Sequence, residues 1–190
     1  MSAFWQFGYS ATSLDQLSDA TDMNRPSMYA AFGDKRALYL KTLDSYTQRS
    51  KEGIAKMLDP QLSLAEGLQR FYDSALASYL PAGDPARGCY LIGTAVTEAL
   101  GDEEVRTRLA SALRDFERMV EARLRQARDA GEIDAAADPQ ALAMIALAVL
   151  YTLAIRSRAG ESHAVLRSAV ATVINLICGR APARKRRRAQ

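Results

Sequence analysis

Three polar residues with a strong preference for the position just before a helix follow one another at short intervals: Ser13, Asn24 and Asp34. A side-chain oxygen at each position can accept a hydrogen bond from a backbone N–H of the following turn, which starts a helix there. The intervals leave room for two short helices, joined by a tight turn, and for the start of a third helix. This spacing constrains the fold of the N-terminal region more than any other feature.

The residues between the two short helices fit a helix-turn-helix. Thr21-Asp22-Met23 supplies the turn. Asp22 stands where a left-handed residue is usual, which Asp tolerates less readily than Gly. Ser18 is small enough to lie where the helices cross, and Met23 can fill the space between them. This geometry places the second short helix in a DNA major groove.

Polar residues near the start of that second helix are candidates for DNA contacts. Arg25 can pair bidentately with guanine, and Ser27 can contact several bases. Tyr29 can reach phosphate through its hydroxyl, and Lys35 adds charge where the dipole of the third helix already favours an anion. A purely structural interpretation stays open, in which Tyr29 and Phe32 are core residues and Lys35 is a solvated surface residue. The candidate DNA-binding residues are Thr12, Ser13, Asn24, Arg25, Pro26, Ser27, Tyr29 and Lys35.

Apolar residues at helical spacing recur through the rest of the chain, whereas strand-like alternation is scarce. Breaks at Asp59-Pro60, residues 81–85, Gly101 and Gly131 separate the helical stretches, and Asp138-Pro139 is a strong helix start. We therefore expect an all-α fold of about nine helices. We divide it into a helix-turn-helix domain (1–46), a helical ligand-binding and dimerisation domain (47–179) and a basic, disordered tail (180–190).

Composition and charge are ordinary for a globular chain, with 48 % hydrophobic and 25 % charged residues among 190. The net charge of +3 is misleading, because six of the 25 basic residues lie in 180–190. The rest of the chain carries 19 basic against 22 acidic residues. Two interpretations of the tail stay open: it adds non-specific contacts to DNA phosphates, or it is a basic end without a function.

Several function classes lack the residues they need. The only histidine is His163, and Cys89 and Cys178 form no CxxC motif, so a zinc site or a histidine-based triad has too few members. No glycine-rich phosphate loop occurs. We expect no enzyme activity, no metal and no cofactor. With neither a long apolar run nor a secretion signal, we expect a cytoplasmic protein without a membrane span and with reduced thiols.

The N-terminal motif resembles the DNA-binding domain of the TetR/AcrR family of repressors. The resemblance rests on the order Gly-Tyr-x-x-Thr-Ser, then Asn-Arg-Pro-Ser-Met-Tyr-x-x-Phe-x-x-Lys-x-x-Leu, and runs without a gap from Phe4 to about Leu40. It implies a homodimeric, ligand-responsive regulator, a repressor that a small molecule releases from palindromic operator DNA. The alternative is a helical small-molecule-binding protein whose shortened head no longer binds DNA.

Three departures from the family pattern matter. Only Met1 to Phe7 precede Gly8, so we expect either a clipped first helix or, preferably, a true start upstream. Ala31 replaces a common His, which removes one phosphate contact. Asp22 replaces the usual Gly of the turn.

The last two helices are apolar on nearly every side, and such a helix must be buried in a core or against a partner. Paired with the same helices of a second copy, they would form a four-helix interface. The alternative is that they only complete the core of one chain. The predicted dimer-interface residues are Leu142, Ile145, Val149, Leu153, Val165, Val170, Val173 and Ile177.

Polar residues on otherwise apolar helices suggest a mostly apolar ligand site with a few orienting groups. Ordinary packing is the competing explanation for each residue. Cys89, in a segment Arg87-Gly88-Cys89-Tyr90 that resembles one branch of the family, is either a redox or electrophile sensor or a buried structural thiol. The candidate ligand residues are Phe71, Tyr72, Tyr79, Cys89, Tyr90, Thr94, Thr97, Glu98, Phe116, Met119, Arg123 and Tyr151.

Overall fold

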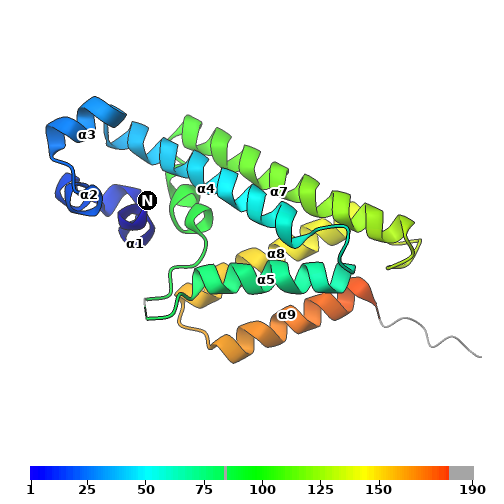
Figure 1. The fold of residues 1–190 in the computed structure, drawn as a ribbon. Coiled ribbons are helices and arrows are strands. Elements are labelled where there is room, and N and C mark those ends of the chain that lie inside the picture. Colours follow the sequence, from blue (N-terminus) through cyan, green and yellow to red (C-terminus); the bar gives the residue numbers. More distant parts are fainter. Residues whose placement is uncertain (84, 180–190) are drawn as a thin grey trace, which may run out of the picture.

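The computed structural model describes residues 1–83 and 85–179, and over these residues it contains nine α-helices, one π-helical turn and no strand. The all-α prediction is therefore confirmed. Figure 1 shows a small group of helices at one end and a bundle of longer helices beside it. The tail predicted for residues 180–190 lies outside the described residues.

Three short helices form the N-terminal head: α1 (Ser2–Ala11), α2 (Leu14–Thr21) and α3 (Arg25–Phe32). The predicted caps are confirmed, since the side chains of Ser13 and Asn24 each accept a hydrogen bond from a backbone N–H one turn further on. These bonds satisfy N–H groups that the helix itself leaves without a partner. The first helix and the two helices of the motif are thus all formed.

The turn between α2 and α3 has the predicted geometry. Asp22 adopts a left-handed conformation, with φ of +53°. The hydroxyl of Ser18 donates a hydrogen bond of 2.6 Å to the carbonyl of Met23, which fixes the turn against α2. The helix-turn-helix is therefore held by local hydrogen bonds as well as by packing.

A buried apolar cluster holds the head together. Phe4, Leu17 and Met28, one from each helix, are all buried. Phe4 also meets the ring of Tyr39 edge-on, with centroids 5.2 Å apart. Because Tyr39 belongs to the next helix, this cluster fixes the orientation of the head relative to the rest of the molecule.

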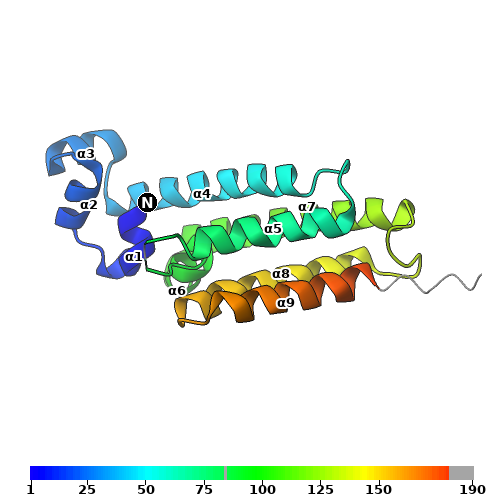
Figure 2. The same ribbon diagram turned by 60° about the horizontal axis from the view of Figure 1, so that its bottom comes forward.

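That next helix, α4 (Lys35–Met57), joins the head to the body. It starts in the head, capped by Asp34, and then runs beside α7 (Glu103–Asp129) in both views (Figures 1 and 2). The boundary predicted at residue 46 falls inside this unbroken helix. A movement of α4 therefore reaches both parts of the molecule.

The body is completed by α5 (Leu64–Tyr79), α8 (Pro139–Arg158) and α9 (His163–Cys178), which pack on one another and, through α5 and α8, on α7. The helix predicted near residues 90–100 is instead a π-helical turn, η1 (Leu91–Ala95), that runs into the short α6 (Val96–Glu98). This segment contacts α1, α7 and α8, so it lies between head and body.

Helix α8 is apolar on most of its surface, and Asp138 and Pro139 start it as predicted. By length and composition alone it could cross a membrane. In this fold it packs against α5, α7 and α9, which is the environment of a core helix in a bundle.

Candidate DNA-reading surface and adjoining cavity

The start of α3 presents a polar, exposed face. Arg25, Pro26 and Ser27 are exposed, and the ring of Tyr29 is 45 % exposed. On the opposite side, Met28 is buried against the head. Residues near the N-terminal end of a recognition helix are those that reach base edges, so this arrangement suits a helix that lies in a major groove.

Arg25 already has a partner in the free protein. Its Nη2 lies 2.6 Å from Oδ1 of Asp15 on α2, and the two side chains are 52 % and 74 % exposed. An exposed ion pair of this kind contributes little to stability, so it breaks at little cost. Asp15 therefore holds the guanidinium only weakly.

Asn24 and Ser13 are exposed at helix N-termini, and their side chains are occupied by capping bonds. Ser13 also completes a capping box, because Gln16 accepts its backbone N–H. Their contribution to phosphate binding would therefore come through the helix N-termini that they organise.

Thr12, another candidate for DNA contact, has its hydroxyl bonded inside the head. Its side chain is buried, and its hydroxyl donates to the carbonyls of Gly8 and Ala3 inside the head. Its backbone N–H is bonded to the carbonyl of Tyr9. Gly8 has φ of +79°, a conformation that favours glycine, and this bend in α1 brings its carbonyl to Thr12.

Lys35 lies in the first turn of α4, where we placed a phosphate contact. Its Nζ donates to the carbonyl of Ser10 at 3.3 Å and lies 4.7 Å from the centre of the Tyr9 ring. Neither neighbour is charged, and no ion pair involves this ammonium among the described residues. That charge is available to a phosphate.

Ion pairs connect the start of α4 to the start of α7. The guanidinium of Arg36 binds Asp102 through two hydrogen bonds, of 2.6 and 2.9 Å, and Glu104 through a third, of 2.9 Å. This guanidinium holds the pKa of the Asp102 carboxyl well below its usual value. Asp102 also caps α7. Asp102 and Glu104 thus tie the head-proximal end of α4 to the body.

Two contacts of α1 form a second connection. The indole N–H of Trp5 donates to the carbonyls of Arg87 and Gly88, at 3.1 Å each, and the Arg87 guanidinium stacks 4.7 Å from the indole ring. Ser10 donates to a carboxylate oxygen of Glu98 at 2.9 Å. Glu98, a predicted ligand residue, therefore contacts the head instead.

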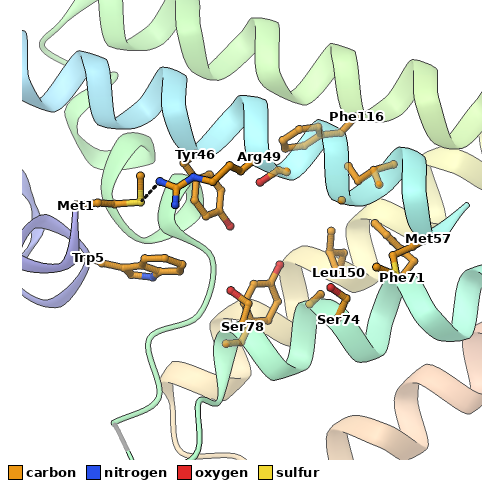
Figure 3. Close-up of a pocket in the computed structure, with 15 residues that line it drawn as sticks. Met1, Trp5, Tyr46, Arg49, Met57, Phe71, Ser74, Ser78, Phe116 and Leu150 are labelled. Carbon is orange, nitrogen blue, oxygen red and sulfur yellow. Dashed lines mark hydrogen bonds between the residues drawn. The ribbon is translucent and has the colours of Figure 1, made fainter.

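A cavity of about 300 Å³ opens next to Trp5 and is shown in Figure 3. It lies between α4 and α5, with α1 at one end and α7 and α8 behind it. Its lining is mostly apolar: Met1, Trp5, Gly53, Ile54, Met57, Phe71, Ala75, Phe116 and Leu150. Its polar lining residues are Tyr46, Arg49, Ser50, Ser74, Ser78 and Tyr79. An apolar cavity with a few polar groups is the composition of a small-molecule site.

Three of the predicted ligand residues, Phe71, Tyr79 and Phe116, line this cavity. The others do not. Tyr72 is buried and donates to the carbonyl of Ala146 at 2.9 Å. Arg123 is buried and paired with Glu132 at 3.0 Å. The remaining residues outside the lining are Cys89, Tyr90, Thr94, Thr97, Glu98, Met119 and Tyr151.

Tyr90 and Thr94 belong to a buried hydrogen-bond network rather than to a ligand site. Tyr39 donates to Thr94 at 2.9 Å, and the hydroxyls of Thr42 and Tyr90 lie 2.7 Å apart. Burial raises the pKa of Tyr39 to about 12, so its hydroxyl stays neutral. The network joins α4 to η1 and is satisfied without a ligand.

Sequence reasoning missed the part of the cavity that α4 contributes, above all Tyr46, Arg49 and Ser50. The available signal was a set of small residues at helical spacing, since Ser50 and Gly53 of α4 and Ser74 and Ser78 of α5 all line the cavity. Small side chains on two facing helices leave space between them.

Cys89 is buried, with its Sγ 3.4 Å from the hydroxyl of Tyr46. It does not line the cavity, although Tyr46 does. Both interpretations of this thiol, as sensor and as structural residue, stay hypotheses. In the part of the chain that the structure describes, no three His, Cys, Asp or Glu side chains are grouped as a metal site requires.

The structure divides the predicted dimer residues into buried, half-buried and exposed groups. Leu153, Val170, Val173 and Ile177 are buried in the core of their own chain. Leu142 and Val149 are half-buried. Ile145 and Val165 are exposed, together with further apolar residues on the same two helices: Met144, Ile155 and Leu176.

Two family models match the chain and together cover most of it. Residues 1–42 match the model described as "Bacterial regulatory proteins, tetR family", and residues 65–173 match "Tetracyclin repressor-like, C-terminal domain". The match over residues 65–173 spans more than half of the chain. The first model corresponds to the N-terminal head and the second to the helical body.

The chain is also similar to curated transcriptional regulators and to solved structures of such regulators. The HTH-type transcriptional repressor ComR of Escherichia coli is 29 % identical over 93 % of this chain and 84 % of its own length. The TetR family regulator CifR, solved as a cysteine mutant with a 26-bp double-strand operator DNA, is 28 % identical, with a TM-score of 0.81 over 91 % of this chain and 90 % of that chain. An Agrobacterium tumefaciens regulator, 20 % identical, shares the fold with a TM-score of 0.82 over 93 % of this chain and 92 % of that chain. The chain belongs to the TetR family of bacterial transcriptional regulators.

Proposed function

We propose that this protein is a homodimeric repressor that holds a palindromic operator through α3 and releases it when a small molecule fills the cavity between α4 and α5. One observation carries the proposal: α4 forms one wall of the cavity and also carries the head. We keep residues 1–46 as the DNA-reading unit and 47–179 as the ligand and dimer unit.

On DNA, Arg25 would leave Asp15 and pair with a guanine, while Ser27 contacts a neighbouring base. Tyr29 and Lys35 would contact phosphates on either side of the groove. Residues 1–46 carry four basic and five acidic side chains, so the head has no general excess of positive charge. Binding therefore depends on a few well-placed groups rather than on a basic surface.

Dimerisation would place two heads on two half-sites. The exposed apolar residues of α8 and α9 follow helical spacing, as in Met144, Ile145 and Ile155 on α8 and Val165 and Leu176 on α9. These two helices lie side by side along one edge of the bundle (Figure 2). Pairing with the same face of a second copy gives the two-fold symmetry that half-sites about one helical turn apart require.

Release would follow from the position of the cavity. A molecule between α4 and α5 presses on α4 and contacts Trp5 of α1, and both elements belong to or carry the head. A small displacement of α4 changes the distance between the two recognition helices, so that they no longer match the half-sites.

The repressor is favoured over a binding protein with a decayed head. Helices α1, α2 and α3 are formed and packed on buried side chains, and α2 and α3 are capped by Ser13 and Asn24. ComR is named a repressor and CifR was solved on operator DNA, which agrees with a DNA-binding role for this chain. Such a protein would act in the cytoplasm, where the DNA is.

An electrophoretic mobility shift with DNA from upstream of the gene tests the function. We expect a sequence-specific complex at moderate salt that Arg25→Ala and Tyr29→Ala weaken by about tenfold or more. Arg114→Ala is the control, because Arg114 is exposed on α7, outside the head. Equal binding by the two head variants and by the native protein, or no preference over unrelated DNA, would contradict it.

A further inference from the structure

We propose that the cavity between α4 and α5 is built for an organic anion, an aromatic or aliphatic carboxylate whose apolar body lies deep in the cavity and whose charged group binds Arg49. This inference rests on the proposed function, in which the cavity is the effector site. The proposal adds the chemical class of the effector and the residue that selects it.

The inner part of the cavity accepts only an apolar group. Phe71, Phe116 and Leu150 are buried there and carry no polar side-chain atom. Met57 of α4 lies beside Phe71 and Leu150 (Figure 3), and Ile54 of the same helix also lines the cavity. Placing an aromatic ring or an alkyl chain against these surfaces removes apolar area from water on both partners, which supplies most of the affinity.

Arg49 is the cationic side chain of the lining. Its guanidinium donates to the carbonyl and hydroxyl of Ser45, at 3.3 and 3.1 Å, and one nitrogen lies 3.6 Å from Sδ of Met1. All three acceptors are neutral. Across residues 1–83 and 85–179, no carboxylate lies within 4.0 Å of this guanidinium, so its charge stays uncompensated.

The other polar groups of the lining favour the same sign of charge. They are hydroxyls: Tyr46, Ser50, Ser74, Ser78 and Tyr79. No Asp or Glu belongs to the lining. Burial raises the pKa values of Tyr46 and Tyr79 well above their usual value, so both are neutral donors near pH 7. The lining therefore offers hydrogen-bond donors to a bound carboxylate, whereas it offers no negative charge to a bound ammonium group.

A guanidinium recognises a carboxylate well, because two parallel N–H bonds match its two oxygens. Arg49 stands at the exposed rim, and the cavity of about 300 Å³ is at the small end of ligand sites. The ligand is therefore a compact molecule with its charge at one end.

Isothermal titration with matched probes tests the proposal: 2-naphthylacetate, its neutral isostere 2-naphthylacetamide, and 2-naphthylethylammonium. We expect the carboxylate to bind about tenfold or more tightly than the amide, and the ammonium to bind least. Arg49→Met should abolish this discrimination, because the carboxylate loses a charge-assisted pair of hydrogen bonds and the amide loses at most a neutral one. Arg114→Met, an exposed arginine outside the cavity, should behave as the native protein.

Ala75→Leu fills the cavity without changing any charge and should weaken the carboxylate and the amide alike. Absence of carboxylate binding at millimolar concentration, equal binding of carboxylate and amide, or discrimination that survives Arg49→Met would each overturn the proposal. Operator binding is measured on the same preparations. A protein that binds DNA but does not discriminate refutes the ligand class alone, and one that discriminates without binding DNA refutes the regulator function alone.

Discussion

Arg25 and Asp15 form an ion pair across the helix-turn-helix, with 2.6 Å between Nη2 and Oδ1. The residue best placed to read a base is thus held by a carboxylate of the neighbouring helix when no DNA is bound. Because both side chains are more than half exposed, the pair is weak and exchanges readily.

Asp15→Asn should therefore raise operator affinity. The change frees Arg25 and removes a negative charge near the phosphates, and we expect a gain of about three- to tenfold in fluorescence anisotropy titrations. Asp19→Asn is the matched control, since Asp19 is exposed on the same helix and the structure gives it no ion pair among the described residues. Equal gains for the two variants would show that only the net charge matters.

Thr12 is expected to matter for stability rather than for direct DNA contact. Thr12→Val keeps the shape but leaves the carbonyls of Gly8 and Ala3 without this donor, which should lower the free energy of unfolding by about 1–2 kcal/mol. Urea denaturation measures the loss, and Thr12→Ser should restore most of it. A stable Thr12→Val protein that fails to bind the operator would instead favour a phosphate contact.

The Arg36–Asp102 pair predicts a pH-dependent stability. The pKa of Asp102 is lower in the folded protein than in the unfolded chain. Its contribution is therefore fully present above the unfolded pKa of about 4 and is lost as pH falls through the folded pKa. Asp102→Asn keeps a capping oxygen for α7 but removes the charge, so its Tm should be lower than that of the native protein near pH 7.

Thermal unfolding from pH 7 down to pH 3 checks this expectation. The Tm difference between the two proteins should begin to narrow below about pH 4, because Asp102 of the unfolded chain then takes up a proton that the folded protein does not. A Tm difference that stays constant with pH would assign the effect of Asp102→Asn to helix capping alone.

The two groups of apolar residues on α8 and α9 should respond differently to mutation. Ile155→Asp and Leu176→Asp change exposed residues, and analytical ultracentrifugation should show a monomer that is still folded. Leu100→Asp is the control, because Leu100 is 86 % exposed but lies after α6, away from this face. Leu153→Ala removes a buried side chain and should lower the free energy of unfolding by about 2–5 kcal/mol. Dimers of Ile155→Asp and Leu176→Asp would place the interface elsewhere.

The helix starts could be predicted because they depend on neighbours in sequence. Ser13, Asn24 and Asp34 bond to backbone groups within one turn, and the left-handed Asp22 follows from the need for a tight turn. The same local rule places the start of α8 at Asp138-Pro139. The fold class and the recognition helix therefore needed no information on long-range packing.

The cavity could not be predicted in the same way, because it depends on which faces of distant helices meet. Arg49 and Ser50 look like ordinary surface residues of α4 until Ser74 and Ser78 of α5 are placed opposite them. The composition of α9 similarly does not separate Val165 from Val170. One is exposed and the other is in the core, and only the packing of α9 on its neighbours decides this.

The most direct test of the account is whether Arg25 reads a base. Operator affinity is measured by anisotropy for every single-base variant of one half-site, with the native protein and with Arg25→Ala. We predict that the native protein discriminates against replacement of one particular guanine by about 1–3 kcal/mol, and that Arg25→Ala loses discrimination at that position while keeping it at the others. A uniform loss of affinity across all positions would show that Arg25 contacts only the backbone and would contradict the account.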